Sequence, residues 1–314
     1  MSVENPEGLF EGPVVPPDLG GKVELSISTD AVSPWRRIFN RFRRNKVAMI
    51  ALAFIALVVL VALFAPWLAP YPPKETSDAI NQTPSAQHLL GTDDVGRDIL
   101  SDVMYGARVS MAVGALTILM AASVAVPIGL FTGYTGGWVD SVTGRLMEAL
   151  MTVPGLVLAL VIAALLGKSI PLVALAIAIP FVPGYVRLIR ASVLAVREET
   201  FIEASRAVGV SRRRMIMKHV LPNVASPLIV QIAVTFGYAL LAEAGLSFLG
   251  FGPGLSWGSQ LSEAYHFVLE DPWGLVPAGT AIFLTVLAFN LLGDGLRDSL
   301  GRETFVIKPE SAGT

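Results

Sequence analysis

The chain has 314 residues, of which 53% are hydrophobic and only 15% are charged, and its formal net charge is −2. This composition excludes an ordinary soluble domain and is typical of a protein that crosses a membrane several times. So small a net charge says nothing about partners. The absence of cysteine excludes disulfides and thiolate metal sites. We expect no bound metal either, because the three histidines are far apart in the sequence: His88, His219 and His266.

The amino-terminal part of the chain is polar and precedes the first apolar stretch. Residues 1–33 are rich in proline, glycine and acidic residues, which predicts a loosely attached cytoplasmic tail. Residues 35–46, WRRIFNRFRRNK, form a basic amphipathic stretch that by itself would allow nucleic-acid binding. Because an apolar span follows directly, the simpler interpretation is a cytoplasmic anchor at the lipid surface, with no nucleic-acid partner. Residues 1–46 are therefore predicted to be a cytoplasmic tail that ends in this anchor.

Six apolar stretches without Asp, Glu, Lys or Arg follow: residues 47–68, 109–134, 149–167, 170–186, 224–242 and 273–293. At about 1.5 Å per residue, the first is long enough for the roughly 30 Å hydrocarbon core of a bilayer. Pro154 predicts a kink in the third stretch, and Pro180 and Pro183 interrupt the fourth. The sequence therefore predicts an all-α polytopic membrane protein with six transmembrane helices in residues 47–301. A polar cytoplasmic tail, residues 302–314, follows.

The basic residues indicate the orientation of these helices. With the amino terminus in the cytoplasm, eighteen lysines and arginines flank the spans on the inside, and four fall outside: Lys74, Arg97, Arg108 and Lys168. The positive-inside rule therefore places both termini in the cytoplasm. The same orientation places segments 69–108 and 250–272 outside and the polar segment 187–223 inside.

The outside segment 69–108 contains a cluster of polar and glycine residues, HLLGTDDVGRD, at residues 88–98. Such a cluster could be a metal or phosphate site, but Asp and Gly at this density more often form turns in which Asp bonds to nearby backbone. An arginine among acids is also more often part of an ion-pair network than a catalytic group. We therefore predict a turn with an ion pair, formed by Gly91, Thr92, Asp93, Gly96, Arg97 and Asp98.

The cytoplasmic segment 198–222 is polar, lies between apolar spans, and predicts two short helices around a glycine bend. The first helix has an apolar face at helical spacing, formed by Phe201, Ala204 and Val208. Gly209 stands where this helix would end, because glycine reaches positive φ without a Cβ penalty.

The second helix of this segment is predicted to be basic at its start and apolar along one side. Ser211 can cap it, and we expect Pro222 to end it. Its apolar stripe is formed by four residues: Met215, Ile216, His219 and Val220. Its first turn, where the helix dipole disfavours positive charge, holds Arg212, Arg213 and Arg214. We expect a compensating group outside the segment, and the pattern leaves open whether this is anionic lipid or an acidic partner surface.

Glu243 is a carboxylate embedded in apolar sequence at the outer end of the fifth span. An acid within a membrane is a candidate functional group. Its distance along the helix places it near the outer interface, so we favour structural pairing over proton coupling. The outside loop 250–272 mixes aromatic and acidic residues, which suits contact with a substrate-delivering protein and equally suits an ordinary interfacial loop.

Several motifs resemble one family, the permeases of ABC importers. The cytoplasmic segment resembles the family's EAA loop through Glu203, Ala204, Gly209, Ile216, His219, Leu221 and Pro222. The outside motif GTDDVGRD, residues 91–98, is similar to the extracytoplasmic signature of the dipeptide, oligopeptide and nickel branch. LSFLG at residues 246–250 and AFNLLGDGLRDSLG at residues 288–301 resemble the same branch. The resemblance covers roughly residues 41–302.

The resemblance implies a type I ABC-importer permease fold in a bacterial cytoplasmic membrane. In that family the loop sits in a groove on the ATPase, so the EAA residues together with Arg212, Arg213 and Arg214 are expected to couple to it. The resemblance further implies a heterodimer with a homologous permease, of which this chain resembles the second. It also implies two ABC ATPase subunits and an extracytoplasmic solute-binding protein. The solute would be a peptide or a related small solute such as a nickel complex.

No catalytic function is expected in this chain. Gly167-Lys168-Ser169 superficially resembles a phosphate-binding loop, but the earlier glycine would be at Ile162, and no Walker motif occurs elsewhere. ATP and magnesium are therefore expected on the partner ATPases, and no cofactor is expected in this chain. The alternative function is a secondary transporter or channel, which would need polar or ionisable residues near the bilayer midplane. The spans are nearly free of charge.

Overall fold

The computed structural model describes residues 34–269 and 271–301. The predicted tails at 1–33 and 302–314, and Glu270 of the outside loop, lie outside the described residues. The chain divides into a short unit, residues 1–37, and a large unit, residues 38–314. Of the short unit, only the start of helix α1 (Pro34–Arg44) is described.

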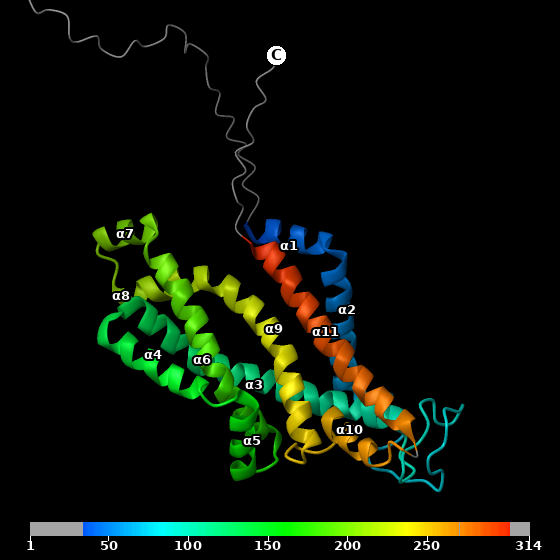
Figure 1. Ribbon diagram of the computed structural model, residues 1–314. Helices are drawn as coiled ribbons and strands as arrows, with labels where there is room; N and C mark the ends of the chain where they lie inside the picture. Colours follow the sequence, from blue (N-terminus) through cyan, green and yellow to red (C-terminus); the bar gives the residue numbers. More distant parts are fainter. Residues whose placement is uncertain (1–33, 270, 302–314) are drawn as a thin grey trace, which may run out of the picture. The chain divides into compact units, whose positions relative to one another are not determined.

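The described part of the large unit is built from helices and contains no β-strand, which confirms the predicted all-α fold (Figure 1). Its long helices are α2 (Lys46–Leu68), α3 (Ile99–Thr135), α6 (Ile170–Arg197), α9 (Leu221–Phe248) and α11 (Leu275–Leu300). Its shorter helices are α4 (Gly137–Met151), α5 (Gly155–Leu166), α7 (Thr200–Ala207), α8 (Arg212–Met215) and α10 (Trp257–His266). A π-helical turn, Ile216–Val220, joins α8 to α9, and a 3-10 turn, Pro272–Gly274, precedes α11.

One of the six predicted crossings is a bent pair of helices. Among the described residues, five helices are long and apolar enough to cross a membrane, and α4 with α5 makes a sixth if the pair counts as one crossing. The two helices meet at 84°. The break falls just before α5, at Pro154, which has no N–H to continue the helix. The predicted kink is therefore a sharp bend, and the crossing begins at Gly137, well before the apolar stretch 149–167.

α3 and α6 pack closely along their length. Glycines on α3 permit this approach: a Cβ on Gly129 would lie 2.8 Å from Ile189, and one on Gly133 would lie 2.9 Å from Val193. α6 runs without interruption through its two prolines to Arg197, so it is longer than the predicted stretch 170–186. This packing places segment 198–222, which follows α6, beside the end of α3.

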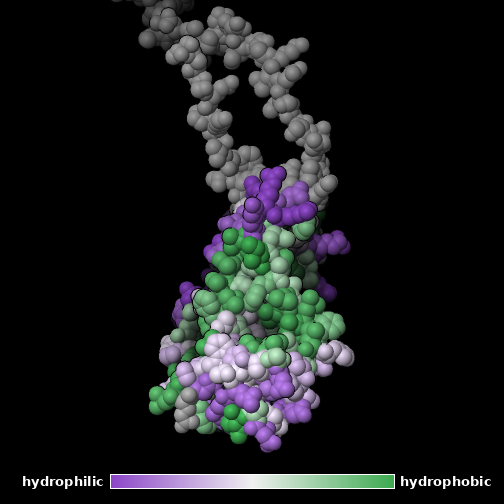
Figure 2. Space-filling view, turned by 90° about the vertical axis from the view of Figure 1, so that its right-hand side faces the viewer, coloured by the Kyte–Doolittle hydropathy of each residue, from purple (hydrophilic) through white to green (hydrophobic). Residues whose placement is uncertain are grey.

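The face formed by α2 and α11 shows how the large unit meets its surroundings. In Figure 2 an apolar band lies between two polar ends. Exposed residues of these two helices include Ile50, Leu63 and Phe283. So wide an apolar surface is stable against lipid rather than water.

Candidate functional sites at the two ends of the helices

The predicted outside turn is present, and Asp93 organises it. Asp93 Oδ1 accepts hydrogen bonds from the backbone N–H groups of Val95 at 3.0 Å and Arg97 at 2.7 Å. Arg97 Nε donates to Asp93 Oδ2 at 2.6 Å, so one carboxylate closes the turn and forms the ion pair. The prediction of a turn with an ion pair is therefore confirmed. Within the described ranges, no group of three or more His, Cys, Asp or Glu is placed to hold a metal ion.

Two glycines of this turn allow the backbone to pack tightly. Gly91 and Gly96 have φ values of 82° and 77°. A Cβ on Gly96 would collide with the carbonyl oxygen of Ser77, and one on Gly91 would collide with that of Gln82. Buried Thr92 holds the same region, because its Oγ1 accepts a hydrogen bond from the Gln82 N–H at 2.9 Å. The outside segment therefore folds back on itself as a compact cap.

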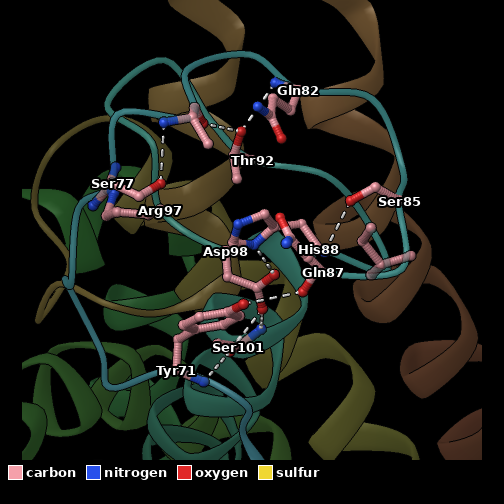
Figure 3. A network of polar contacts seen from close by, with 12 residues as sticks. Tyr71, Ser77, Gln82, Ser85, Gln87, His88, Thr92, Arg97, Asp98 and Ser101 are labelled. Atoms are coloured by element: carbon pink, nitrogen blue, oxygen red, sulfur yellow. Dashed lines mark hydrogen bonds and ion pairs between the residues drawn. The ribbon is translucent and has the colours of Figure 1, made fainter.

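Asp98 connects this cap to α3 (Figure 3). Its Oδ2 accepts hydrogen bonds from the N–H of Ser101 at 2.8 Å and from its hydroxyl at 2.7 Å, which caps the helix. Its Oδ1 lies 3.0 Å from Nδ1 of His88, whose ring stacks on Tyr71 with centroids 4.9 Å apart. The N–H of Tyr71 donates to Ser101 Oγ at 3.1 Å. The outside segment is therefore fixed to the start of α3 at two points, Tyr71 and His88.

Helix α10 of the outside loop is held against α3 by contacts that the sequence did not predict. The indole Nε1 of Trp257 donates to the carbonyl oxygen of Val103 at 2.9 Å. Gln260 Nε2 donates to the carbonyl oxygen of Asp102 at 2.5 Å. Side-chain donors thus reach backbone acceptors in the first turns of α3, which fixes the position of α10 on this helix.

Arg97 joins the outside turn to α10. Its Nη2 donates to Glu263 Oε2 at 2.6 Å, while its Nε remains on Asp93. Burial by itself would lower the pKa of Arg97, but the hydrogen bond to Glu263 and the charge of Asp93 outweigh burial and raise the pKa. The arginine therefore keeps its charge and bridges two segments that are far apart in the sequence.

Glu243 is buried beside this network. It accepts hydrogen bonds from the hydroxyl of Ser110 at 2.8 Å and from that of Ser247 at 2.6 Å. Ser110 Oγ also accepts a hydrogen bond from the N–H of Trp257 at 3.2 Å. The structural pairing favoured for this carboxylate is therefore confirmed, and it links α3, α9 and α10.

The predicted bend in the cytoplasmic segment lies between α7 and α8. Gly209 has a φ of 79°. The N–H groups of Gly209 and Val210 donate to the carbonyl oxygens of Arg206 at 2.9 Å and Ser205 at 3.1 Å, closing the end of α7. A Cβ on Gly209 would meet no atom within 4 Å, so the backbone conformation, and not a lack of space, requires glycine here.

The predicted apolar face of α7 lies on the exposed side of the helix and does not pack into the core. Phe201 and Val208 are 40% and 84% exposed, and Ala204 is also exposed, whereas Ile202 is fully buried. α7 rests on the ends of α3 and α6, and it is Ile202 that therefore faces inward. Ile202 packs with residues of three helices: Leu130, Val193, Val196, Met215 and Val220. The outward side of α7, which includes exposed Glu203, keeps its apolar residues uncovered.

The predicted apolar stripe of the second helix is confirmed. Met215 and Val220 are fully buried, and Ile216 and His219 are half-buried. Ser211 occupies the N-cap position, but its side chain makes no capping hydrogen bond, contrary to the prediction. The stripe, and not the cap, therefore anchors this helix.

Pro222 does not end the second helix, contrary to the prediction. α8, the π-helical turn and α9 continue as one helix. In the turn the N–H of Leu221 donates to the carbonyl oxygen of Ile216, which widens the helix locally. Pro222 follows at this irregular point, and Asn223 Nδ2 donates to the carbonyl oxygen of His219 at 2.7 Å. Segment 198–222 is therefore directly continuous with a membrane-capable helix.

The three arginines of the second helix differ in their surroundings. The guanidinium carbon of Arg212 lies 5.3 Å from the ring centroid of Tyr134 and 5.7 Å from that of Phe131. Arg212 also donates a hydrogen bond to the hydroxyl of Thr135, the last residue of α3. Aromatic faces attract cations, so α3 itself compensates for the positive charge of Arg212, a role that was expected of lipid or a partner. Arg213 and Arg214 are exposed, and for them a compensating partner stays a prediction.

The structure places the two groups of predicted site residues at opposite ends of α3. Neither aromatic partner of Arg212 was predicted from the sequence, and α10 was predicted only as part of a loop. A usable signal did exist, because Phe131 and Tyr134 are aromatic residues at the end of a span that is followed by basic segments. Sequence alone gave no reason to pair them with one particular arginine.

This architecture defines a class of protein, an all-α protein that crosses a membrane several times. The fold is similar to a chain of the MetNI methionine ABC transporter in an inward-facing conformation, with a TM-score of 0.55. That match covers 65% of this chain and 98% of the MetNI chain, at 15% sequence identity, and shows the fold alone.

The sequence itself matches two family models. Residues 125–306 match the binding-protein-dependent transport system inner membrane component family, and residues 33–86 match the N-terminal transmembrane domain of oligopeptide transport permease C. The dipeptide transport system permease protein DppC of Alkalihalophilus pseudofirmus is 43% identical over 274 residues, covering 86% of this chain and 90% of the relative. The glutathione transport system permease protein GsiD of Escherichia coli is 41% identical over 273 residues, covering 85% and 90%.

The chain therefore belongs to the binding-protein-dependent transport system inner membrane component family. It is a non-catalytic permease subunit of an ABC importer, embedded in the cytoplasmic membrane. Such a subunit works with ATPase and substrate-binding partners. The comparisons give no support for a secondary transporter or channel.

Proposed function

We propose that this permease couples to ABC ATPase subunits through residues 198–222. The supporting observation is the uncovered apolar surface around Gly209, formed by Phe201, Val208 and Met217, with Glu203 exposed beside it. Apolar side chains on a rigid helix–glycine–helix element suit a groove in a protein partner better than contact with water. The remaining residues of the EAA-like motif and Arg213 and Arg214 complete this coupling surface.

The orientation follows from the same proposal. Coupling to an ATPase requires segment 187–223 to be cytoplasmic, and the distribution of lysine and arginine independently favours this side. Both termini are then cytoplasmic, with tails at 1–46 and 302–314. Segments 69–108 and 250–272 are outside, where the cap and α10 meet a solute-binding protein.

The complete importer contains this chain, a homologous permease, two ABC ATPase subunits and an extracytoplasmic solute-binding protein. ATP and magnesium bind to the ATPases, and this chain holds no cofactor. ATP binding draws the ATPases together, the coupling surface moves with them, and the helices change between inward-facing and outward-facing states. Transport is driven because nucleotide biases these two states differently.

The transported solute is a short peptide. Relatives that match most of this chain are named for dipeptide and glutathione transport, which favours a peptide over a nickel complex. The full importer in proteoliposomes, supplied with ATP inside and its solute-binding protein outside, should accumulate labelled dipeptide. Uptake of a nickel complex without uptake of any peptide would overturn this substrate class.

Coupling is tested by charged substitutions on the exposed apolar surface. Phe201→Asp with Val208→Asp should abolish co-purification of ATPase in mild detergent, because both exposed apolar side chains become charged. Leu269→Asp is the matched control, since Leu269 is 97% exposed in the outside loop. If the double variant still brings down ATPase at the level of wild type and the control, the coupling proposal is wrong.

A further inference from the structure

A polar cavity of about 530 Å³ lies between α4 and α6 and is not part of the coupling surface. The charged residues that line it are Asp140, Arg145, Glu148, Arg187 and Arg190. Arg187 and Arg190 are about 25 to 30 Å along α6 from its start at Ile170. The cavity therefore lies toward the same end of the helices as the coupling surface.

Two of the three arginines in this cavity are free to bind an anion. Arg190 is neutralised by Asp140, to which its Nη2 donates at 2.6 Å and its Nε donates as well. Arg187 Nη1 donates to the sulfur of Met151 at 3.5 Å, and among the described residues no ion pair of Arg187 is found. For Arg145 no ion pair is found within the described chain, and its side chain is exposed. Apart from the Arg190–Asp140 pair, the cavity is therefore lined by two cations, Arg145 and Arg187, and one acid, Glu148.

The surface next to the cavity is apolar. α4 exposes Trp138, Val142 and Leu146, which are spaced by four residues and lie along one side of the helix. Trp138 is 77% exposed. Arg145 follows Trp138 by seven residues, or about two turns, so it stands on nearly the same side. An apolar stripe with a tryptophan and a basic residue is typical of a helix at the membrane interface.

We propose that this cavity binds the phosphate of an anionic phospholipid of the cytoplasmic leaflet. Arg145 and Arg187 donate hydrogen bonds to the phosphate oxygens, and an acyl chain lies along Trp138 and Leu146. Planar guanidinium groups match phosphate geometry, and basic pockets between membrane helices on the cytoplasmic side suit anionic headgroups. A free phosphate would use the same arginines but not the apolar stripe. The proposal rests on the orientation given under the proposed function.

The bound lipid would act as a bridge between α4 and α6. Within the described residues lining the cavity, the Arg190–Asp140 pair is the direct ionic link between these helices. A phosphate held from α4 by Arg145 and from α6 by Arg187 adds a second link. The bent crossing would therefore be held more firmly on α6 in a membrane that contains anionic lipid.

The test measures lipid retained by the complete importer. The complex is reconstituted in phosphatidylcholine with phosphatidylglycerol, extracted in mild detergent, and weighed by native mass spectrometry. Wild type should retain phosphatidylglycerol, and Arg145→Gln with Arg187→Gln should reduce its retention at least tenfold. Arg108→Gln with Lys168→Gln removes the same charge from exposed positions at the opposite end of the helices and should leave retention unchanged. Equal loss in both double variants, or no loss in either, would overturn the proposal.

Two further arms identify the ligand. Trp138→Ala with Leu146→Ala removes the apolar stripe but keeps both arginines, and it should still reduce lipid retention. Inorganic phosphate and glycerol 3-phosphate should fail to displace the lipid at millimolar concentration. If they displace it fully and the stripe variant retains it normally, the ligand is a free anion and the lipid proposal is wrong. ATPase co-purification is measured on the same samples, so that failure of the importer assembly is recorded separately from loss of lipid.

Discussion

The guanidinium carbon of Arg212 lies 5.3 Å from the ring centroid of Tyr134, which joins segment 198–222 to the end of α3. α3 has 37 residues and is therefore about 55 Å long. Its other end carries Asp98 and Ser110, which hold the outside cap and α10. A single helix thus contacts both segment 198–222 and the network around Asp98 and Trp257.

We expect Arg212→Ala to weaken coupling while leaving assembly intact. The substitution removes a contact of about 0.5 to 1 kcal/mol between the cation and the ring, because Arg212 is exposed. Uptake per ATP hydrolysed by the reconstituted importer should fall several-fold. Tyr134→Leu should give a smaller loss, because Phe131 still contacts Arg212, and Tyr134→Phe, which keeps the aromatic face, should give none. If Tyr134→Leu and Tyr134→Phe behave alike, the ring is not the functional partner of Arg212.

Gly209→Val should uncouple transport from ATP hydrolysis. The native φ of 79° costs a β-branched residue about 1 to 2 kcal/mol or more, so the end of α7 should rearrange. Asn tolerates this conformation, and Gly209→Asn should retain most transport. The measurement is peptide uptake together with ATPase rate in proteoliposomes. Normal stimulated uptake by the valine variant would show that the bend is not needed.

Ser110→Ala should destabilise the outside network. It leaves the buried Glu243 carboxyl and the Trp257 N–H each without one hydrogen bond, at a cost of about 1 to 3 kcal/mol. Ser123→Ala is the control, because Ser123 is an exposed residue of the same helix that bonds only to its local carbonyl at 2.8 Å. Thermal unfolding of the solubilised protein should shift for the first variant alone. Equal shifts would mean that the hydroxyl bridge contributes nothing specific.

Gly96→Ala should disrupt the cap, because the new methyl group would collide with the carbonyl oxygen of Ser77. Gly254→Ala separates collision from backbone strain, since Gly254 also has positive φ, 74°, but has open space around its Cβ position. Limited proteolysis of the outside segment should be faster for Gly96→Ala than for Gly254→Ala. Similar rates would assign the effect to the φ angle and not to the close approach.

Several features of this protein follow from local properties of its sequence. The apolar stretches identify the crossings because each must match the thickness of a bilayer, and that length depends only on helical rise. The bend at Gly209 and the ion-pair turn at Asp93 and Arg97 were also predictable, because residues close in sequence form them. The motifs around Glu203 and Gly91 likewise indicated the family before any fold was known.

The tertiary structure decided which residues of distant segments meet. It placed Ile202 inward and left Phe201 exposed, because the ends of α3 and α6 cover one side of α7. It seated Arg212 against the rings of Phe131 and Tyr134 at the end of α3, a contact that three consecutive arginines cannot encode. It carried the helix past Pro222 through a π-helical turn, because burial of the stripe outweighs the missing N–H. Packing between helices is non-local, and for that reason no local pattern specified these contacts.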